Sequence, residues 1–138
     1  SRYGREIARY AEDLARSPAG RRLIPDLTRL AVRARLWSRA AGISEKLIAR
    51  RVAGGTKGLH VANDWLLSTE RSMLEESGLP HRPWFRHLIY APLPSYAAET
   101  LPAVREAAEA GQRETARREA ARLVRKLDAA MTATRRVR

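Results

Sequence analysis

The side chains of this sequence that can perform acid–base or metal chemistry are few, and their spacing does not build a site. The candidates are three histidines and two pairs of glutamates: His60, His81, His87, Glu75 with Glu76, and Glu106 with Glu109. The histidines lack a metal-ligand spacing, and there is no Glu-x-x-His pair of the kind that builds a di-iron bundle. Both glutamate pairs are expected on solvated helical faces. We therefore predict that this domain has no catalytic residue, no metal site and no cofactor of its own.

A glycine-rich run and the tryptophans also have ordinary explanations. Residues 54–58, G-G-T-K-G, superficially resemble a phosphate loop, but the order G-x-x-x-x-G-K-[ST] is absent and no strand precedes them. A flexible turn is the better interpretation. Trp37, Trp65 and Trp84 are more typical of a core or an interface than of a ligand cage. His87 is predicted to be a structural residue that forms hydrogen bonds. Together these residues indicate a module for packing and association.

The composition is that of one folded domain with a strong positive charge. The 138 residues are 44% hydrophobic, contain no cysteine and carry a formal net charge of +12. Nearly all of the basic residues are arginine, and the region 61–110 is acidic between two basic ends. This charge leaves open an alternative, a stand-alone basic helical protein that binds nucleic acid. The sequence has no signal peptide and no starting methionine, so we expect either a processed product or a piece of a longer protein.

The spacing of apolar residues predicts an all-α fold. Tyr3, Ile7, Tyr10 and Leu14 follow the 3–4 spacing of a one-sided helix, and the later segments repeat this pattern. Helices are predicted at about residues 3–16, 26–53, 59–77, 100–110 and 112–132. We expect residues 1–138 to form a single antiparallel helical bundle, with four main helices plus a short one.

A proline-rich excursion interrupts the helices between the third and the fourth. The stretch from Leu79 to Pro102 holds five of the seven prolines, and proline both lacks a backbone donor and disfavours helix at the preceding residue. We predict an extended segment over 79–99, with the apolar residues from Trp84 to Tyr90 at least half buried. Long non-helical connections within a helical domain are uncommon and are often functional.

This stretch carries a resemblance to a known family. The run G-L-P-H-R-P-W-F-R-H-L-I-Y-A-P at 78–92, followed by S-Y-A-A-E-T-L-P-A-V at 95–104, resembles the C-terminal transferrin receptor-like dimerisation domain. That domain ends the transferrin receptors and the zinc peptidases of the glutamate carboxypeptidase II family. The run E-I-A-R-Y-A-E-D-L at 6–14 is similar to the first helix of the family. The residues of the structural motif are Pro83, Trp84, Phe85, Arg86, His87, Tyr90 and Pro92.

The resemblance implies a role in assembly within a larger exopeptidase. The parent protein would have an N-terminal peptidase domain that holds two zinc ions, and this domain would pair with its own copy and with the peptidase domain. No contact with nucleic acid or membrane is expected of it. A receptor-like parent that has lost its zinc ligands is the alternative within the same family. Members of the family are mostly extracellular, periplasmic or displayed at the cell surface, and we expect the same location here.

The resemblance also implies one contribution to a substrate pocket. In the glutamate carboxypeptidases a loop with the sequence N-K-Y-A-G-E follows the Y-A-P motif, and its Lys and Tyr hold the terminal glutamate of the substrate. Tyr96 occupies the tyrosine position, whereas Ser95 stands where the lysine would be. A tyrosine hydroxyl can donate a hydrogen bond to a carboxylate, but the charge-assisted contact of a lysine is lost. A glutamate preference is therefore not implied, and an aminopeptidase or dipeptidase is equally compatible.

Two apolar helical faces are the candidates for self-association. Two adjacent stripes run along residues 27–47, and a face with small residues runs along 116–131. The interface candidates on these faces are Leu30, Trp37, Leu47, Leu123 and Leu127.

Overall fold

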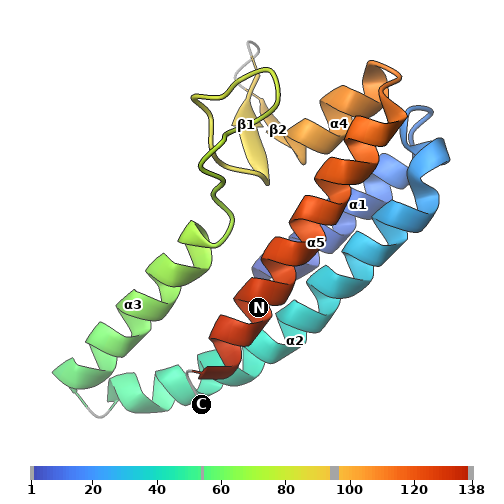
Figure 1. Ribbon diagram of the computed structural model, residues 1–138. Coiled ribbons are helices and arrows are strands. Elements are labelled where there is room, and N and C mark those ends of the chain that lie inside the picture. Colours follow the sequence, from blue (N-terminus) through green and yellow to red (C-terminus); the bar gives the residue numbers. More distant parts are fainter. Residues whose placement is uncertain (1, 54, 94–96, 137–138) are drawn as a thin grey trace.

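The computed structural model describes residues 2–53, 55–93 and 97–136, and its chain is predominantly helical (Figure 1). The helices are α1 (Arg2–Arg16), the short 3-10 helix η1 (Gly20–Leu23), α2 (Ile24–Ala53), α3 (Thr56–Arg71), α4 (Pro102–Glu109) and α5 (Arg113–Arg136). The strands β1 (Tyr90–Pro92) and β2 (Ala98–Thr100) form a small hairpin before α4. The all-α bundle predicted from the sequence is confirmed. In the part of the chain that is described, no helix is both long enough and apolar enough to cross a membrane.

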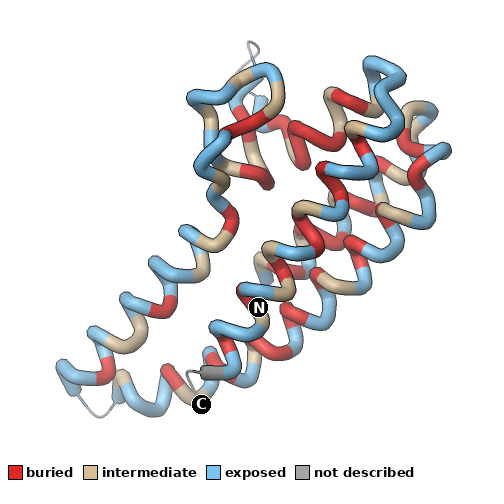
Figure 2. Tube along the Cα trace, viewed as in Figure 1, coloured by how far each residue is buried: buried red, intermediate tan, exposed pale blue. Residues whose placement is uncertain are grey.

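The core lies where α1, α2 and α5 pack together (Figure 2). Gly4 of α1 lets the first two helices approach closely, because a Cβ atom there would lie 2.7 Å from the carbonyl oxygen of Ala34. Trp37 of α2 is completely buried, and its ring meets that of Tyr3 edge to face with the centroids 5.8 Å apart. Its indole N–H donates a hydrogen bond of 3.2 Å to the hydroxyl of Thr134 in α5. Trp37 therefore ties the three helices together.

The antiparallel arrangement predicted for the bundle does not hold for α2 and α5. Asp26 pairs with Arg117 at 3.4 Å, whereas Ser44 donates a hydrogen bond of 3.1 Å to the carbonyl oxygen of Thr134. Residue numbers thus rise together along both helices, which means that α2 and α5 run parallel. The reason is that α3 and the segment that follows it carry the chain back toward the start of α2 before α5 begins (Figure 1).

Helix α3 ends earlier than the sequence predicts, at Arg71 rather than at residue 77. From Met73 onward the backbone exchanges intrahelical hydrogen bonds for contacts with the residues before β1. The amide of Glu75 donates to the carbonyl of Arg86 at 2.9 Å, and the amide of Leu88 donates to the carbonyl of Met73 at 3.1 Å. Since these partners lie about a dozen residues further on, the local helical pattern of 59–77 could not reveal them.

The segment predicted to be extended, 79–99, begins instead with turns at residues 80–84. Gly78 adopts φ 67°, and a Cβ atom there would lie 2.2 Å from the carbonyl oxygen of Pro83, so the chain folds tightly back on itself at this point. The amide of Leu79 then donates to the carbonyl of Phe85 at 2.9 Å. Among the residues of this segment that the structure describes, regular strand pairing is limited to the hairpin, where Tyr90 faces Thr100.

Candidate functional site

An aromatic cluster attaches the hairpin to the bundle. The ring of Tyr90 in β1 stacks on that of Tyr3 at 6.4 Å and meets that of Tyr10 edge to face at 5.8 Å. The hydroxyl groups of Tyr90 and Tyr10 lie 3.3 Å apart, within hydrogen-bonding distance. Burial, reinforced by the hydrogen bond with Tyr10, raises the pKa of Tyr90 well above its ordinary value. The tyrosine thus stays neutral and serves as an anchor on α1.

His87 is the second anchor of this segment, and it is a structural residue as its sequence context suggests. Its Nδ1 accepts hydrogen bonds of 3.2 Å from the backbone amides of Ile89 and Tyr90. Its Nε2 lies 2.9 Å from a carboxylate oxygen of Glu70, near the end of α3. Because Nδ1 acts as an acceptor, Nε2 carries the proton that is donated to Glu70. The ring therefore links α3 to the start of β1.

The remaining motif residues differ in burial, and one of them departs from the expectation. Trp84 is 76% exposed, so it does not meet the prediction that it is at least half buried within this chain. Phe85 is partly buried and packs on the core. Pro83, Arg86 and Pro92 are exposed. Trp84 lies in a turn, where side chains do not alternate as they do along a strand, and this removes the basis for the prediction.

An ion cluster that the sequence did not predict joins the turn after Gly78, strand β2 and helix α4. Nη2 of Arg82 lies 3.0 Å from Oε2 of Glu99 in β2 and also contacts a carboxylate oxygen of Glu106 in α4. Glu99 is only 7% exposed. Burial is the largest cause that raises the pKa of Glu99, and the charge of Glu106 adds to it, whereas Arg82 opposes the rise. Arg82 and Glu99 both lie in the two runs that carry the family resemblance, and this was the available signal.

The two residues predicted to touch substrate, Ser95 and Tyr96, lie outside the described residues. The surface on either side of them is an open, mainly apolar depression of about 290 Å³. Its lining residues are Phe85, Tyr90, Ala91, Pro92, Ala97 and Ala98. This depression consists of motif residues and both strands of the hairpin.

Four of the five interface candidates belong to the core of the single chain. Leu30, Trp37, Leu123 and Leu127 are at most 2% exposed, and Leu47 is partly exposed. A second chain cannot reach the buried four, so their assignment to an interface is corrected. The large apolar side chains that α2 and α3 do expose are others: Ile24, Val32, Leu36, Ile43, Leu59, Leu66 and Leu67.

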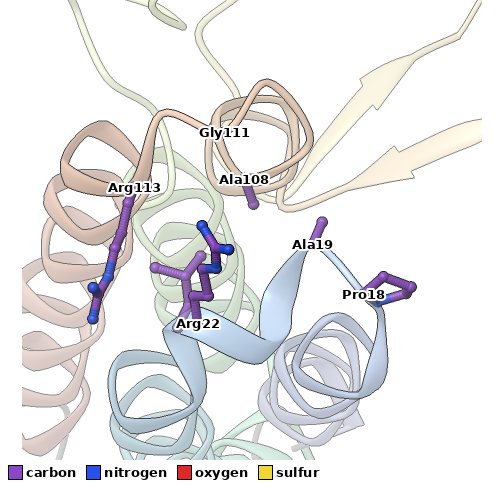
Figure 3. Close-up of a pocket in the computed structure, with 7 residues that line it drawn as sticks. Pro18, Ala19, Arg22, Ala108, Gly111 and Arg113 are labelled. Atoms are coloured by element: carbon purple, nitrogen blue, oxygen red, sulfur yellow. The ribbon is translucent and has the colours of Figure 1, made fainter.

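Further hollows lie away from the motif. One, of about 200 Å³, is formed where η1, α4 and the start of α5 meet, and Arg22 extends into it beside Arg113 (Figure 3). Another, of about 550 Å³, lies between α1 and α2 and is basic. Its charged lining residues are Arg5, Arg35, Arg39 and Lys46. Among the residues that the structure describes, no group of three or more His, Cys, Asp or Glu side chains could hold a metal ion.

Comparison with known proteins identifies the family of this chain. A family model described as "Transferrin receptor-like dimerisation domain" matches residues 24–134. "Probable glutamate carboxypeptidase LAMP1" of Arabidopsis thaliana is 30% identical over 107 residues, which cover 76% of this chain and 15% of that protein. "Inactive zinc metalloprotease C354.09c" of Schizosaccharomyces pombe is 39% identical over 69 residues, or 49% of this chain and 9% of that protein. The chain thus spans only a small part of these relatives. It belongs to the family of transferrin receptor-like dimerisation domains.

Proposed function

We propose that this chain is the non-catalytic homodimerisation domain of a larger zinc-dependent exopeptidase. The observation that carries the proposal is the apolar face of α3, which the chain itself leaves uncovered. Among the described residues Thr56–Arg71, only Gly58 and Trp65 are buried. Leu59 and Leu66 are 53% and 59% exposed, although they are leucines of a helix that packs on α2.

The occupant of this face is a second copy of the chain. Leu59 and Leu66 are seven residues apart, so they lie on one side of the helix, and Leu67 extends the same patch. In a two-fold symmetric dimer each copy presents the same patch, and every residue of the patch contributes twice. The family membership favours this occupant over an unrelated partner.

Sedimentation velocity of the 138-residue chain is the direct test of self-association. We expect a dimer at micromolar concentration, because several half-exposed leucines become covered in each copy. A strict monomer at all concentrations would contradict a dimer that this domain forms by itself. Measurement of the full-length parent in the same way would then show whether its other domains are required.

We further propose that the connection between β1 and β2 contributes to the substrate pocket of the parent. The support is the position of Tyr96 in the family pattern and the apolar depression formed by the flanking residues of the hairpin. The Tyr96 hydroxyl would donate a hydrogen bond to a substrate carboxylate. Because Ser95 supplies no positive charge, this contact would be weaker than the charge-assisted contact of a lysine. The two zinc ions would belong to the peptidase domain of the parent.

A receptor-like or inactive parent is the second candidate. One specific observation favours it: the Schizosaccharomyces pombe relative carries the name of an inactive metalloprotease. The sequence that precedes this domain in the parent distinguishes the two candidates. A complete set of zinc-binding His, Asp and Glu residues would support the peptidase, and zinc analysis of the purified parent provides an independent check.

A further inference from the structure

The guanidinium group of Arg82 contacts three other segments of the chain. Its Nη1 donates a hydrogen bond of 3.3 Å to the carbonyl oxygen of Pro92, at the end of β1. Its Nη2 donates to Glu99 of β2 at 3.0 Å and also contacts Glu106 of α4. Arg82 itself lies in the turn that follows Gly78 and is bridged to Leu79. A single side chain therefore joins this turn, both strands of the hairpin and a helix of the bundle.

These contacts lie at the end of the hairpin that holds the connection between its strands. Pro92 pairs with Ala98 in the ladder, and Glu99 is the next residue of β2. The hairpin has three residues in each strand. A hairpin of this size is at best marginally stable by itself and requires packing or a tether. At its other end Tyr90 is already held by the aromatic cluster on α1.

We propose that Arg82 is a positioning residue, which clamps the outer end of the β1–β2 hairpin to α4 and thereby sets the position of the paired strand ends, Pro92 and Ala98. Its effect on a substrate pocket rests on the function proposed above. The clamp itself does not depend on that function, because all of the contacts of Arg82 lie within this chain.

Arginine is suited to this role because its planar guanidinium carries five donors in a fixed fork and stays charged. A lysine has a single point charge and would not reach the carbonyl of Pro92 and both carboxylates with the same geometry. Arg82 is also the cation between two like charges, Glu99 and Glu106. Arg105 of α4 is the other nearby cation, and it is engaged with Thr100 and Glu109.

Hydrogen exchange of two backbone amides in the 138-residue chain tests the clamp. The amide of Leu93 donates to Ala97 at 3.0 Å at the outer end of the hairpin, and the amide of Leu101 donates to Ile89 at 2.9 Å at the inner end. In Arg82→Gln we expect the protection of Leu93 to fall about tenfold, and that of Leu101 and the core helices to change much less. In Arg82→Lys the protection of Leu93 should lie between that of the wild type and that of Arg82→Gln. Arg86→Gln, which changes an exposed arginine of the same segment, is the matched control.

Unchanged protection of Leu93 in Arg82→Gln would overturn the clamp. An equal loss of protection in the hairpin and in the core helices would also overturn it, because that pattern indicates general destabilisation. Arg82→Lys keeps the positive charge, so it remains informative even if Arg82→Gln does not fold.

A titration supplies a measurement that a general effect on folding would not change. Arg82 is the group that lowers the pKa of Glu99, against burial and the charge of Glu106. Carbon-detected NMR of the Glu99 carboxyl should therefore show a higher pKa in Arg82→Gln than in the wild type. An unchanged pKa of Glu99 would mean that the guanidinium does not hold this carboxylate.

Kinetics of the full-length parent separate this proposal from the proposed function. If Arg82→Gln lowers the protection of Leu93 and raises KM more than it lowers kcat, the clamp and the contribution of the hairpin connection to the substrate pocket are both supported. If protection falls while KM and kcat stay the same, the clamp is supported, and the contribution of the connection to the pocket is refuted.

Discussion

Replacement of Leu66 by alanine in α3 gives the sharpest test of the proposed dimer. Leu66 is 59% exposed in the single chain, so a second copy could cover more than half of its surface. Alanine has the higher helix propensity, and α3 should therefore stay intact. The substitution removes apolar surface without adding charge or bulk. A change in association can then be attributed to the lost contact.

The expected effect follows from the area that is lost. Leu→Ala removes three carbon atoms, worth about 0.8 kcal/mol each when they are fully buried. The exposed share of Leu66 reduces this to about 1.4 kcal/mol per copy. A two-fold dimer contains the residue twice, so association should weaken by about 3 kcal/mol, or about 100-fold in Kd. This value assumes that the second copy covers the side chain completely.

The assay is sedimentation velocity over a concentration series, with circular dichroism as a check on folding. Ile24→Ala is the matched control, because Ile24 is 49% exposed but lies at the start of α2, at the opposite end of this helix from α3. If Ile24→Ala weakens the dimer as much as Leu66→Ala does, the interface is not centred on α3. If Leu66→Ala leaves Kd unchanged, the dimer does not cover this face at all.

Three other predictions concern the substrate pocket, the ion cluster and the packing of α1. Tyr96→Phe in the full-length parent should raise KM more than it lowers kcat, and unchanged kinetics would remove Tyr96 from the pocket. The pKa of Glu99 is raised above its ordinary value of 4.5, so its contribution to stability is fully present below about pH 4.5 and is lost as the pH rises through its folded value. Urea unfolding measured from pH 4.5 upward should therefore show that the free energy of unfolding falls less with pH in Glu99→Gln than in the wild type. An equal fall in both proteins would contradict the raised pKa of Glu99. Gly4→Ala should destabilise the chain by about 1–3 kcal/mol, because the new Cβ would lie 2.7 Å from a backbone oxygen. A Tm equal to that of the wild type would show that α1 and α2 are not so close.

Much of the fold could be predicted because its causes are local. The repeat of Tyr3, Ile7, Tyr10 and Leu14 depends on the helical period alone, and α1 follows it. The prolines and the run from Gly78 to Pro92 indicated both the break in the helices and the family. The end of α3 could not be predicted, because Met73 and Glu75 bond to residues near β1 rather than to the preceding turn.

The candidate site was predictable to a smaller extent. An apolar stripe looks the same in a sequence whether it covers the core of its own chain or faces a second copy. Trp37 and Leu127 were therefore assigned to an interface, although the chain itself buries them. The exposed face of α3 emerged only when each helix had been placed beside its neighbours.

The sequence by itself determined the helical class, the position of the proline-rich excursion and the family, because these depend on residue types at short spacing. Only the tertiary structure decided which leucines remain exposed and which side chains form an ion cluster. Arg82 is 17 residues from Glu99 and 24 from Glu106, and nothing in their local patterns pairs them. The fold of the turn after Gly78, the hairpin and α4 together bring the three charges into contact, since each segment is positioned by packing against the bundle.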